Sequence, residues 1–270
     1  MSISDNNQRE QLFVIKVGGN VIDNPALLQS FLADFAKVPG NKLLIHGGGK
    51  IATRIGDKLG IESKYVDGRR ITDADTIDVV TMVYGGLVNK QLVAKLQALG
   101  CNAIGLTGAD ANIIPAAKRP VKEIDYGFVG DVLPAAMNVA GLQAIVRAGL
   151  IPVFASLTHD GKGQMLNTNA DTIAASLAIA LSASYQVRLI YCFEKKGVLS
   201  DAADDNAVIN LIDRNSYEQL KEEKVLTDGI LPKLENAFEA ITSGVNEVLI
   251  GHAADILSNT SGTVSGTLIR

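Results

Sequence analysis

The sequence predicts an α/β fold, a three-layer αβα sandwich with a mainly parallel central sheet. Two observations carry this prediction: short apolar segments recur along the chain, and segments with helix start signals lie between them. Alternation of this kind is typical of parallel strands joined by helices that cover both faces of the sheet. The predicted strands are 12–17, 42–46, 102–106, 151–155, 187–192 and 247–250.

Each predicted helix has a recognisable start. Asn24 directly precedes Pro25 and is a suitable N-cap, because an asparagine side chain accepts hydrogen bonds from first-turn amides and proline tolerates the first helical position. A long helix over about 74–98 is predicted to open with Thr72, with Asp75 three residues on. Further helices are predicted to start near Asn138, Asn169 and Pro232.

Two stretches depart from this alternation of strands and helices. Residues 62–71 and 111–132 are polar and β-like, which predicts hairpins at the edge of the sheet. The apolar stretch 172–185 is shorter than the roughly 20 residues that a membrane span needs and contains serines, so we interpret it as a buried helix.

Composition narrows the class of protein. The 270 residues are 47% hydrophobic and 20% charged, which is typical of a globular protein with one large domain or two joined lobes. We place the lobes at 1–184 and 185–270, within one continuous sheet. The net charge is −4 and no extended basic stripe occurs, so we expect neither nucleic acid nor membrane as a partner.

The redox setting and location follow from the cysteines and the start of the chain. Cys101 and Cys192 lie beside or within apolar runs, which predicts buried free thiols and no disulfide framework. The first eleven residues are polar and lack the apolar region of a secretory signal. We therefore expect a cytoplasmic protein.

Two predicted strands run directly into glycine turns, FVIKVGGN at 13–20 and LLIHGGGK at 43–50. In open α/β sheets, ligands bind beyond the carboxyl ends of the strands. Glycine amides can approach an anion closely because no Cβ is in the way, and Lys16 adds a positive charge. The two turns predict a phosphoryl-binding site, with ordinary tight turns as the alternative.

Other glycine motifs fit less well. A P-loop would need glycine at Leu44 and serine or threonine at Ile51. An esterase oxyanion loop would need a G-x-S-x-G elbow, which the chain lacks. A dinucleotide fingerprint leaves the first turn and Lys16 unexplained, although its positions are met by Gly47, Gly49, Ala52 and Asp67.

Two later segments add polar residues at predicted helix starts. Asn167, Asn169 and Asp171 alternate before the helix of MLNTNADTIAASLA, where they serve either as caps or in a site. Lys233 lies at the start of the helix in VLTDGILPKLENAFEA. The helix dipole disfavours a cation there, so Lys233 indicates a nearby anion.

Six motifs occur in the order IKVGG, IHGGGK, DGRRITDAD, YGFVGDV, LNTNADTIA and LTDGILPK. Together they resemble the amino-acid kinase superfamily over nearly the whole chain, from Lys16 to the final GTLI. Within it, the similarity is greatest to members that phosphorylate the γ-carboxylate of N-acetyl-L-glutamate in arginine biosynthesis. The resemblance implies ATP with Mg²⁺, an acyl phosphate product and no metal site made by the protein alone.

The resemblance also implies roles for particular residues. Lys16 and Lys233 would stabilise the transferring phosphoryl group, and Asp171 would hold both lysines. Residues implied to bind the acylated glutamate are Gly48, Gly49, Arg70, Asn167 and Asn169. Residues implied to bind the nucleotide are Gly18, Gly19, Glu194, Lys195, Lys196, Gly197, Asp228 and Gly229.

The sequence departs from the superfamily at two places. Relatives read LTDVxGV where this chain has YCFEKKGVL, so Lys195 or Lys196 either neutralises part of the triphosphate or forms a solvated charge pair. Arg69 stands where relatives carry an apolar residue near the acyl group. It either points to solvent or pairs with a second carboxylate, and the latter would make N-succinyl-L-glutamate the substrate.

Assembly and the non-enzyme alternative complete the expectations. The resemblance implies a homodimer through the helix around 74–98, whose apolar, small-residue face includes Val79, Val80, Val83, Gly86 and Leu87. No helix fits before the first strand, so we expect insensitivity to arginine.

A catalytically inactive amino-acid sensor would be expected to have lost at least one of Lys16, Lys233 and Asp171. We interpret His46 as structural.

Overall fold

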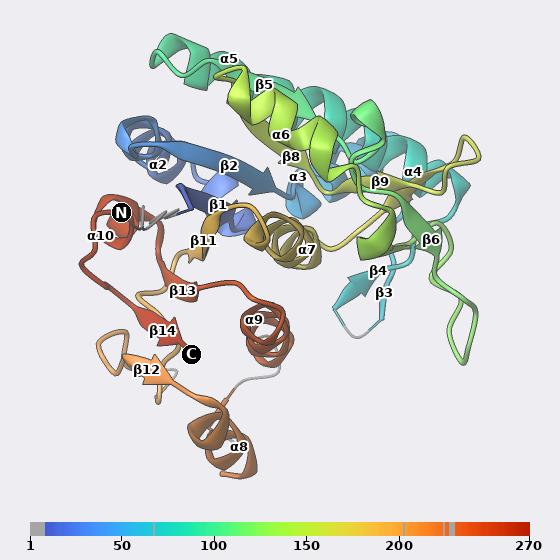
Figure 1. The fold of residues 1–270 in the computed structure, drawn as a ribbon. Coiled ribbons are helices and arrows are strands. Elements are labelled where there is room, and N and C mark those ends of the chain that lie inside the picture. Colours follow the sequence, from blue (N-terminus) through green and yellow to red (C-terminus); the bar gives the residue numbers. More distant parts are fainter. Residues whose placement is uncertain (1–8, 67, 202, 224, 227–229) are drawn as a thin grey trace.

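A computed structural model describes residues 9–66, 68–201, 203–223, 225–226 and 230–270. Its centre is an eight-stranded sheet with the strand order β12-β14-β13-β11-β1-β2-β8-β5 (Figure 1). All neighbouring strands are parallel except β13 and β14. The strands are β1 (Gln11–Val17), β2 (Asn41–His46), β5 (Ala103–Leu106), β8 (Ile151–Ala155), β11 (Gln186–Phe193), β12 (Leu211–Ile212), β13 (Glu247–His252) and β14 (Thr267–Ile269).

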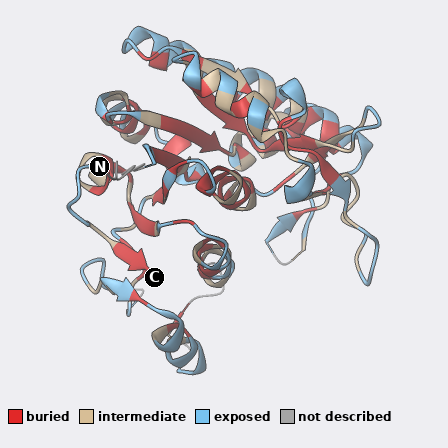
Figure 2. Cartoon of the chain, viewed as in Figure 1, coloured by how far each residue is buried: buried red, intermediate tan, exposed pale blue. Residues whose placement is uncertain are grey.

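The predicted α/β sandwich is confirmed, because helices pack on both faces of this sheet. Alternate residues of β1 enter two separate cores: Leu12 and Val14 lie in one, Phe13 and Ile15 in the other. The strands of the central sheet are mostly buried (Figure 2). The first core receives residues from α6 (Val139–Arg147), α7 (Ala170–Ser182), α8 (Arg214–Glu222) and α9 (Leu231–Thr242). The second receives residues from α1 (Gly19–Ile22), α2 (Pro25–Lys37), α3 (Gly49–Lys58), α4 (Ala74–Val80), α5 (Asn89–Ala98) and α10 (Ile256–Thr260).

The six predicted strands all lie in the sheet, and most helix starts are confirmed. Asn24, Asn138 and Asn169 are N-caps whose side chains accept hydrogen bonds from first-turn amides. The buried helix expected at 172–185 is α7. The sequence missed β12 and β14, which have only two and three residues, and so show no period.

The predicted start of the long helix was wrong. Asp73, not Thr72, caps α4 and accepts a hydrogen bond from the amide of Thr76. Thr72 instead bonds another segment, because its amide donates to Tyr126 and its carbonyl accepts from Phe128. The helix also changes its winding, since a π-helix, Thr81–Val88, lies between α4 and α5.

The two expected hairpins exist but not at the edge of the central sheet. They are β3 (Tyr65–Val66) with β4 (Arg69–Arg70), and β6 (Ala116–Lys118) with β7 (Gly130–Val132). Each forms its own two-stranded sheet, as does a third hairpin, β9 (Leu157–His159) with β10 (Met165–Asn167). These hairpins lie together on the right of Figure 1, beyond α7.

The expected dimer face of the long helix is partly wrong. Val79, Val80 and Val83 are buried within the protein's own second core and cannot contact a partner. Gly86 and Leu87 are exposed, and so is Met82, which we did not include.

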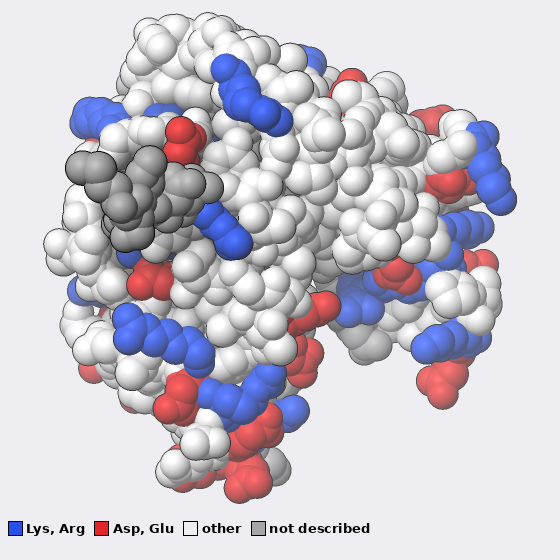
Figure 3. Space-filling view, in the orientation of Figure 1, with Lys and Arg blue, Asp and Glu red and all other residues white. Residues whose placement is uncertain are grey.

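The distribution of surface charge and the length of the helices are relevant to the expected partners. In Figure 3, lysine, arginine, aspartate and glutamate side chains are interspersed on the visible face, which also has a wide uncharged area. Within the described residues, every helix is too short or too polar to cross a membrane.

A buried lysine joins β2 to the end of α2. Lys42 is only 5% exposed, and its ammonium group donates hydrogen bonds to the carbonyls of Phe35, Ala36 and Val38 at 2.8, 3.0 and 2.6 Å. The end of a helix leaves carbonyls without intrahelical partners, although the Phe35 carbonyl also accepts from the amide of Val38 at 3.2 Å. Burial lowers the pKa of Lys42. This interaction could not be predicted from the sequence, because a lysine in a strand is usually exposed.

We predict that Lys42→Met lowers the free energy of unfolding by about 2–4 kcal/mol, because it leaves buried carbonyls without donors. The matched control is Lys37→Met in α2, whose ammonium lies 2.9 Å from Asp34 on the surface. An exposed ion pair contributes less than about 1 kcal/mol. Urea unfolding of both variants measures the difference, and equal losses would contradict the prediction.

Candidate active site

Three parallel strands end side by side at one edge of the sheet. Val17 of β1 pairs with His46 of β2 on one side and with Cys192 of β11 on the other. Both glycine turns and Glu194 therefore begin at the same edge. This is the carboxyl edge of the strands, where ligands of open α/β sheets bind.

Two lysines from distant parts of the chain converge on one carboxylate. Lys16 is the penultimate residue of β1, and Lys233 lies in the first turn of α9. Asp171 lies in the first turn of α7, between them. The Lys16 Nζ is 2.7 Å from Asp171 Oδ1, and the Lys233 Nζ is 3.1 Å from Asp171 Oδ2.

The charges of this cluster do not cancel. The side chains of Lys16 and Asp171 are only 12% and 10% exposed. Burial acts to raise the pKa of Asp171, but the ammonium groups of Lys16 and Lys233 outweigh it and hold that pKa below its usual value. Among the described residues, neither lysine has a second acidic partner within ion-pair distance. One positive charge is thus left to attract an anionic ligand.

In the first glycine turn, the amide of Gly18 is hydrogen-bonded within the protein, whereas Gly19 has open space beside it. The Gly18 amide donates to the carbonyl of Cys192 at 2.8 Å, and a Cβ on Gly18 would lie 3.1 Å from that of Phe193. Gly18 therefore serves the close approach of β1 and β11, and its amide is not free for a phosphate. Gly19 begins α1, and nothing lies within 4 Å of the position of its Cβ.

Asn20 links the first turn to its neighbours, and the sequence analysis missed it. Its side chain donates to Glu194 at 2.5 Å and accepts from the Lys50 Nζ at 2.5 Å. Glu194 thus lies beside the glycine turns, and Lys50 is a further cation there. Nucleotide binding by Glu194 stays a prediction. Asn20 directly follows the motif glycines, which was the available signal.

The second glycine turn leads into α3. Gly48 precedes the helix, and a Cβ on it would lie 3.0 Å from the ring of Tyr84. The amides of the first turn of α3 have no partner within the helix, so they can bind an anion. Arg70 is 7% exposed and holds this helix start, because its Nη2 donates to Gly49 O and Thr53 Oγ1, each at 2.8 Å.

The two predicted asparagines have structural contacts. The Asn169 side chain caps α7 and accepts from the amides of Asp171 and Thr172, so it fixes the turn that carries the shared carboxylate. The Asn167 Nδ2 donates to Thr72 Oγ1 at 3.1 Å. Capping is therefore confirmed for Asn169, and substrate binding by either residue stays a prediction.

Lys195, Lys196 and Gly197 have contacts of their own that do not involve Lys16, Asp171 or Lys233. Lys195 forms an ion pair with Asp205 at 2.6 Å, and Lys196 donates to Asn206 at 2.6 Å. Gly197 is packed, since a Cβ there would lie 2.7 Å from Thr267 Oγ1. Asp228 and Gly229 are outside the described residues.

Arg69 points away from the contacts of Arg70, as neighbouring strand residues do. It is exposed and lines a cavity of 530 Å³ that also has Arg119, Lys122, Glu123 and Asp131 in its wall. Arg119 and Asp131 pair with each other at 2.5 Å.

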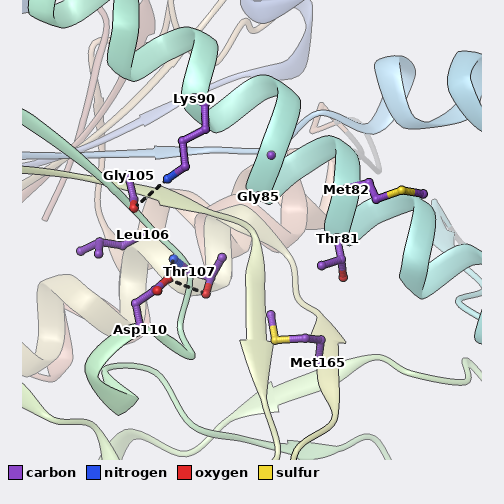
Figure 4. A pocket seen from close by; sticks show the side chains of 10 residues that line it. Thr81, Met82, Gly85, Lys90, Gly105, Leu106, Thr107, Asp110 and Met165 are labelled. Carbon is purple, nitrogen blue, oxygen red and sulfur yellow. Dashed lines mark hydrogen bonds between the residues drawn. The ribbon is translucent and has the colours of Figure 1, made fainter.

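A second cavity, of 420 Å³, lies between the π-helix and the end of β5 (Figure 4). The predicted site residues are absent from its wall. Lys90 points into it and donates to the carbonyl of Gly105 at 3.1 Å.

His46 and the cysteines are buried, as expected. His46 is 0% exposed, and burial lowers its pKa to about 4. Both thiols are free, and burial raises the pKa of Cys192 to about 12. Neither His46 nor Cys192 is therefore ionised at neutral pH.

The chain is similar in sequence and in fold to known proteins. The sequence profile described as "Amino acid kinase family" matches residues 11–252. An acetylglutamate kinase of Bacteroides thetaiotaomicron is 59% identical, over 93% of this chain and 97% of that protein. An acetylglutamate kinase of Cytophaga hutchinsonii is 56% identical, over 96% and 99%. The crystal structure of smu.665 from Streptococcus mutans has a TM-score of 0.74 and 28% identity, over 96% and 98%. The chain belongs to the amino acid kinase family.

Proposed function

We propose that this protein transfers the γ-phosphoryl group of ATP to the γ-carboxylate of N-acetyl-L-glutamate, forming an acyl phosphate in arginine biosynthesis. The relatives named acetylglutamate kinase support this substrate, at up to 59% identity over nearly the full length of both chains. The structural observation that carries the proposal is the pair of lysines on Asp171.

The chemistry needs no base. A γ-carboxylate has a pKa near 4 and is already ionised at neutral pH, so no proton has to be removed before it attacks phosphorus. What remains is to hold the reactants in line and to neutralise charge on the phosphoryl oxygens. Lys16, Lys233 and the amides at the start of α3 can supply that charge.

Asp171 acts on the lysines and not on the substrate in this proposal. With its carboxylate between them, the two ammonium groups can lie close together despite their repulsion. They are then fixed before the substrate arrives, which avoids a reorganisation cost during transfer.

We propose that Mg²⁺ arrives with ATP. The described residues contain no group of three His, Cys, Asp or Glu side chains that could hold a metal ion. Mg²⁺ commonly binds through substrate phosphates with few protein ligands, and it neutralises charge on them.

The lobes divide the substrates in this proposal. Residues 1–184 bind the acyl-glutamate and form the dimer, and residues 185–270 bind ATP near Glu194. The cytoplasmic location and the insensitivity to arginine stay predictions, and residues 1–8 lie outside the described part of the chain.

We predict that the purified protein forms an acyl phosphate from ATP, Mg²⁺ and N-acetyl-L-glutamate, trapped as the hydroxamate. Lys16→Ala and Lys233→Ala should each lower kcat by roughly 10²–10³-fold, as the loss of other electrostatic stabilisers does. The control is Lys58→Ala, an exposed lysine at the end of α3.

The same assay separates the alternatives. An amino-acid sensor would bind the acyl-glutamate without forming hydroxamate. A kcat/KM higher for N-succinyl-L-glutamate would replace the proposed substrate and give Arg69 a direct role. Wild-type kcat in Lys16→Ala would remove the role given to that lysine.

We predict a pH-dependent stability from Asp171. Since its pKa is lowered on folding, its ionised form stabilises the protein fully above the unfolded value of about 3.9, and this contribution is lost as the pH falls through the folded value. Wild type should therefore exceed Asp171→Asn in free energy of unfolding by roughly 3 kcal/mol at pH 7, less at pH 3. Urea unfolding at several pH values measures this, and a gap that widens in acid would contradict it.

We propose a homodimer formed through the exposed apolar residues of the π-helix, Met82 and Leu87, which are 56% and 41% exposed. Met82→Glu should give a monomer in analytical ultracentrifugation, because it buries a charge in the contact. Val121→Glu, at a residue 61% exposed in a loop, is the control and should stay dimeric. A dimeric Met82→Glu would place the contact elsewhere.

A further inference from the structure

The peptide planes of the second glycine turn are fixed through their carbonyl groups. The His46 Nδ1 lies 2.7 Å from the carbonyl of Gly47. The Gly48 carbonyl accepts from the amide of Ala52 at 2.9 Å, and the Gly49 carbonyl accepts from Arg70 at 2.8 Å. All three carbonyls therefore have a donor within the protein.

A hydrogen bond that fixes the carbonyl of one residue also fixes the direction of the next residue's amide. In a trans peptide the C=O of one residue and the N–H of the next share a plane and point in opposite directions. A donor on the Gly47 carbonyl therefore directs the Gly48 N–H the other way. The direction of that amide depends on His46.

The hydrogen bonds of His46 allow only one arrangement of protons. Since the Gly47 carbonyl can only accept, the His46 Nδ1 must carry the hydrogen. The Nε2 lies 3.0 Å from the Asn89 Nδ2, which also donates to the carbonyl of Val153 at 2.8 Å. Rotating the amide would set the Asn89 oxygen against that carbonyl, so Nε2 accepts and the imidazole is neutral.

Asn89 is itself held in place from several sides. It is 1% exposed and lies where the π-helix ends and α5 begins. Its Oδ1 accepts from the Lys90 Nζ at 3.2 Å. That oxygen would lie 1.9 Å from a Cβ on Gly105, so only glycine at that position lets Asn89 lie there.

The π-helix also packs directly on the turn. A Cβ on Gly48 would lie 3.0 Å from Tyr84 and 3.3 Å from Val88, both residues of that helix. The turn is thus confined by contacts on one side and by the Asn89–His46 hydrogen bonds on another. π-helical turns are frequent near functional sites.

We propose that Asn89 and His46 are positioning residues that aim the Gly48 amide at the transferring phosphoryl group. The proposal rests on the proposed function, because it assigns a task in the same reaction. His46 touches no substrate in this scheme, since it is 0% exposed. It acts through Gly47, and Asn89 selects the tautomer that can do so.

General base catalysis by His46 is the competing role. Burial lowers its pKa to about 4, the Gly47 carbonyl opposes that shift, and the nearby charge of Lys90 adds to it. A buried imidazole whose two nitrogens are both engaged cannot take a proton from a substrate. Positioning is the role that its contacts support.

Two substitutions of similar size separate positioning from packing. The amide of asparagine can occupy the place of Nδ1, so His46→Asn keeps a donor for Gly47. Glutamine reaches the place of Nε2, so His46→Gln keeps the contact with Asn89 but loses that donor. The assay measures kcat and KM for N-acetyl-L-glutamate, and the melting temperature of each variant is recorded.

We expect His46→Gln to lower kcat by roughly 10–100-fold and His46→Asn by less than about fivefold, with similar losses in melting temperature. KM for N-acetyl-L-glutamate should change less than kcat. Equal kcat values in the two variants would overturn the proposal. An inactive wild type would instead overturn the proposed function.

A measurement on the wild-type protein tests the tautomer of His46 independently of the activity assay. The chain has 3 histidines, so ¹⁵N-edited NMR can resolve each ring. We expect His46 to carry its hydrogen on Nδ1 at neutral pH, and the Nε2–H form would contradict the proposal. Gly105→Ala, which displaces Asn89, should give a mixture of tautomers together with a lower kcat.

Discussion

The site depends on the two ion pairs of the Asp171 carboxylate. This carboxylate contacts ammonium groups that are far apart in the sequence, one at the end of β1 and one at the start of α9. Without it, two cations would repel each other in a partly buried place. The fold makes the meeting possible because Lys16 lies on the face of β1 that α7 and α9 both cover. The pairing of β1 with β11 then joins the two lobes in one sheet.

The glycine turns complete this cluster in different ways. The first brings β1 and β11 close together through Gly18 and leaves Gly19 open. The second has every carbonyl engaged by a donor, so its amides are directed and not merely available. Hydrogen bonds from buried groups are therefore as much a part of this site as the two lysines on Asp171.

Local signals predicted the elements well, because strands and caps depend on neighbours in the sequence. Asn24, Asn138 and Asn169 were found by capping chemistry alone. The errors arose where contacts between residues far apart in the sequence determine the local structure. Thr72 bonds a loop more than fifty residues away instead of capping a helix. The valines assigned to the dimer face lie in the second core, because that apolar face of the helix packs against the protein itself.

The lysines and Asp171 could be assigned from the sequence only through resemblance, since nothing local links residue 16 to residue 233. Asn20, Lys50 and Asn89 were missed, although Asn20 and Lys50 directly follow the motif glycines. A carboxylate nucleophile needs no proton removed, so His46 can be buried here as a neutral hydrogen-bond donor. The same residue type that serves as a base in other enzymes can here fix a peptide plane, and its lowered pKa keeps it neutral while it does so.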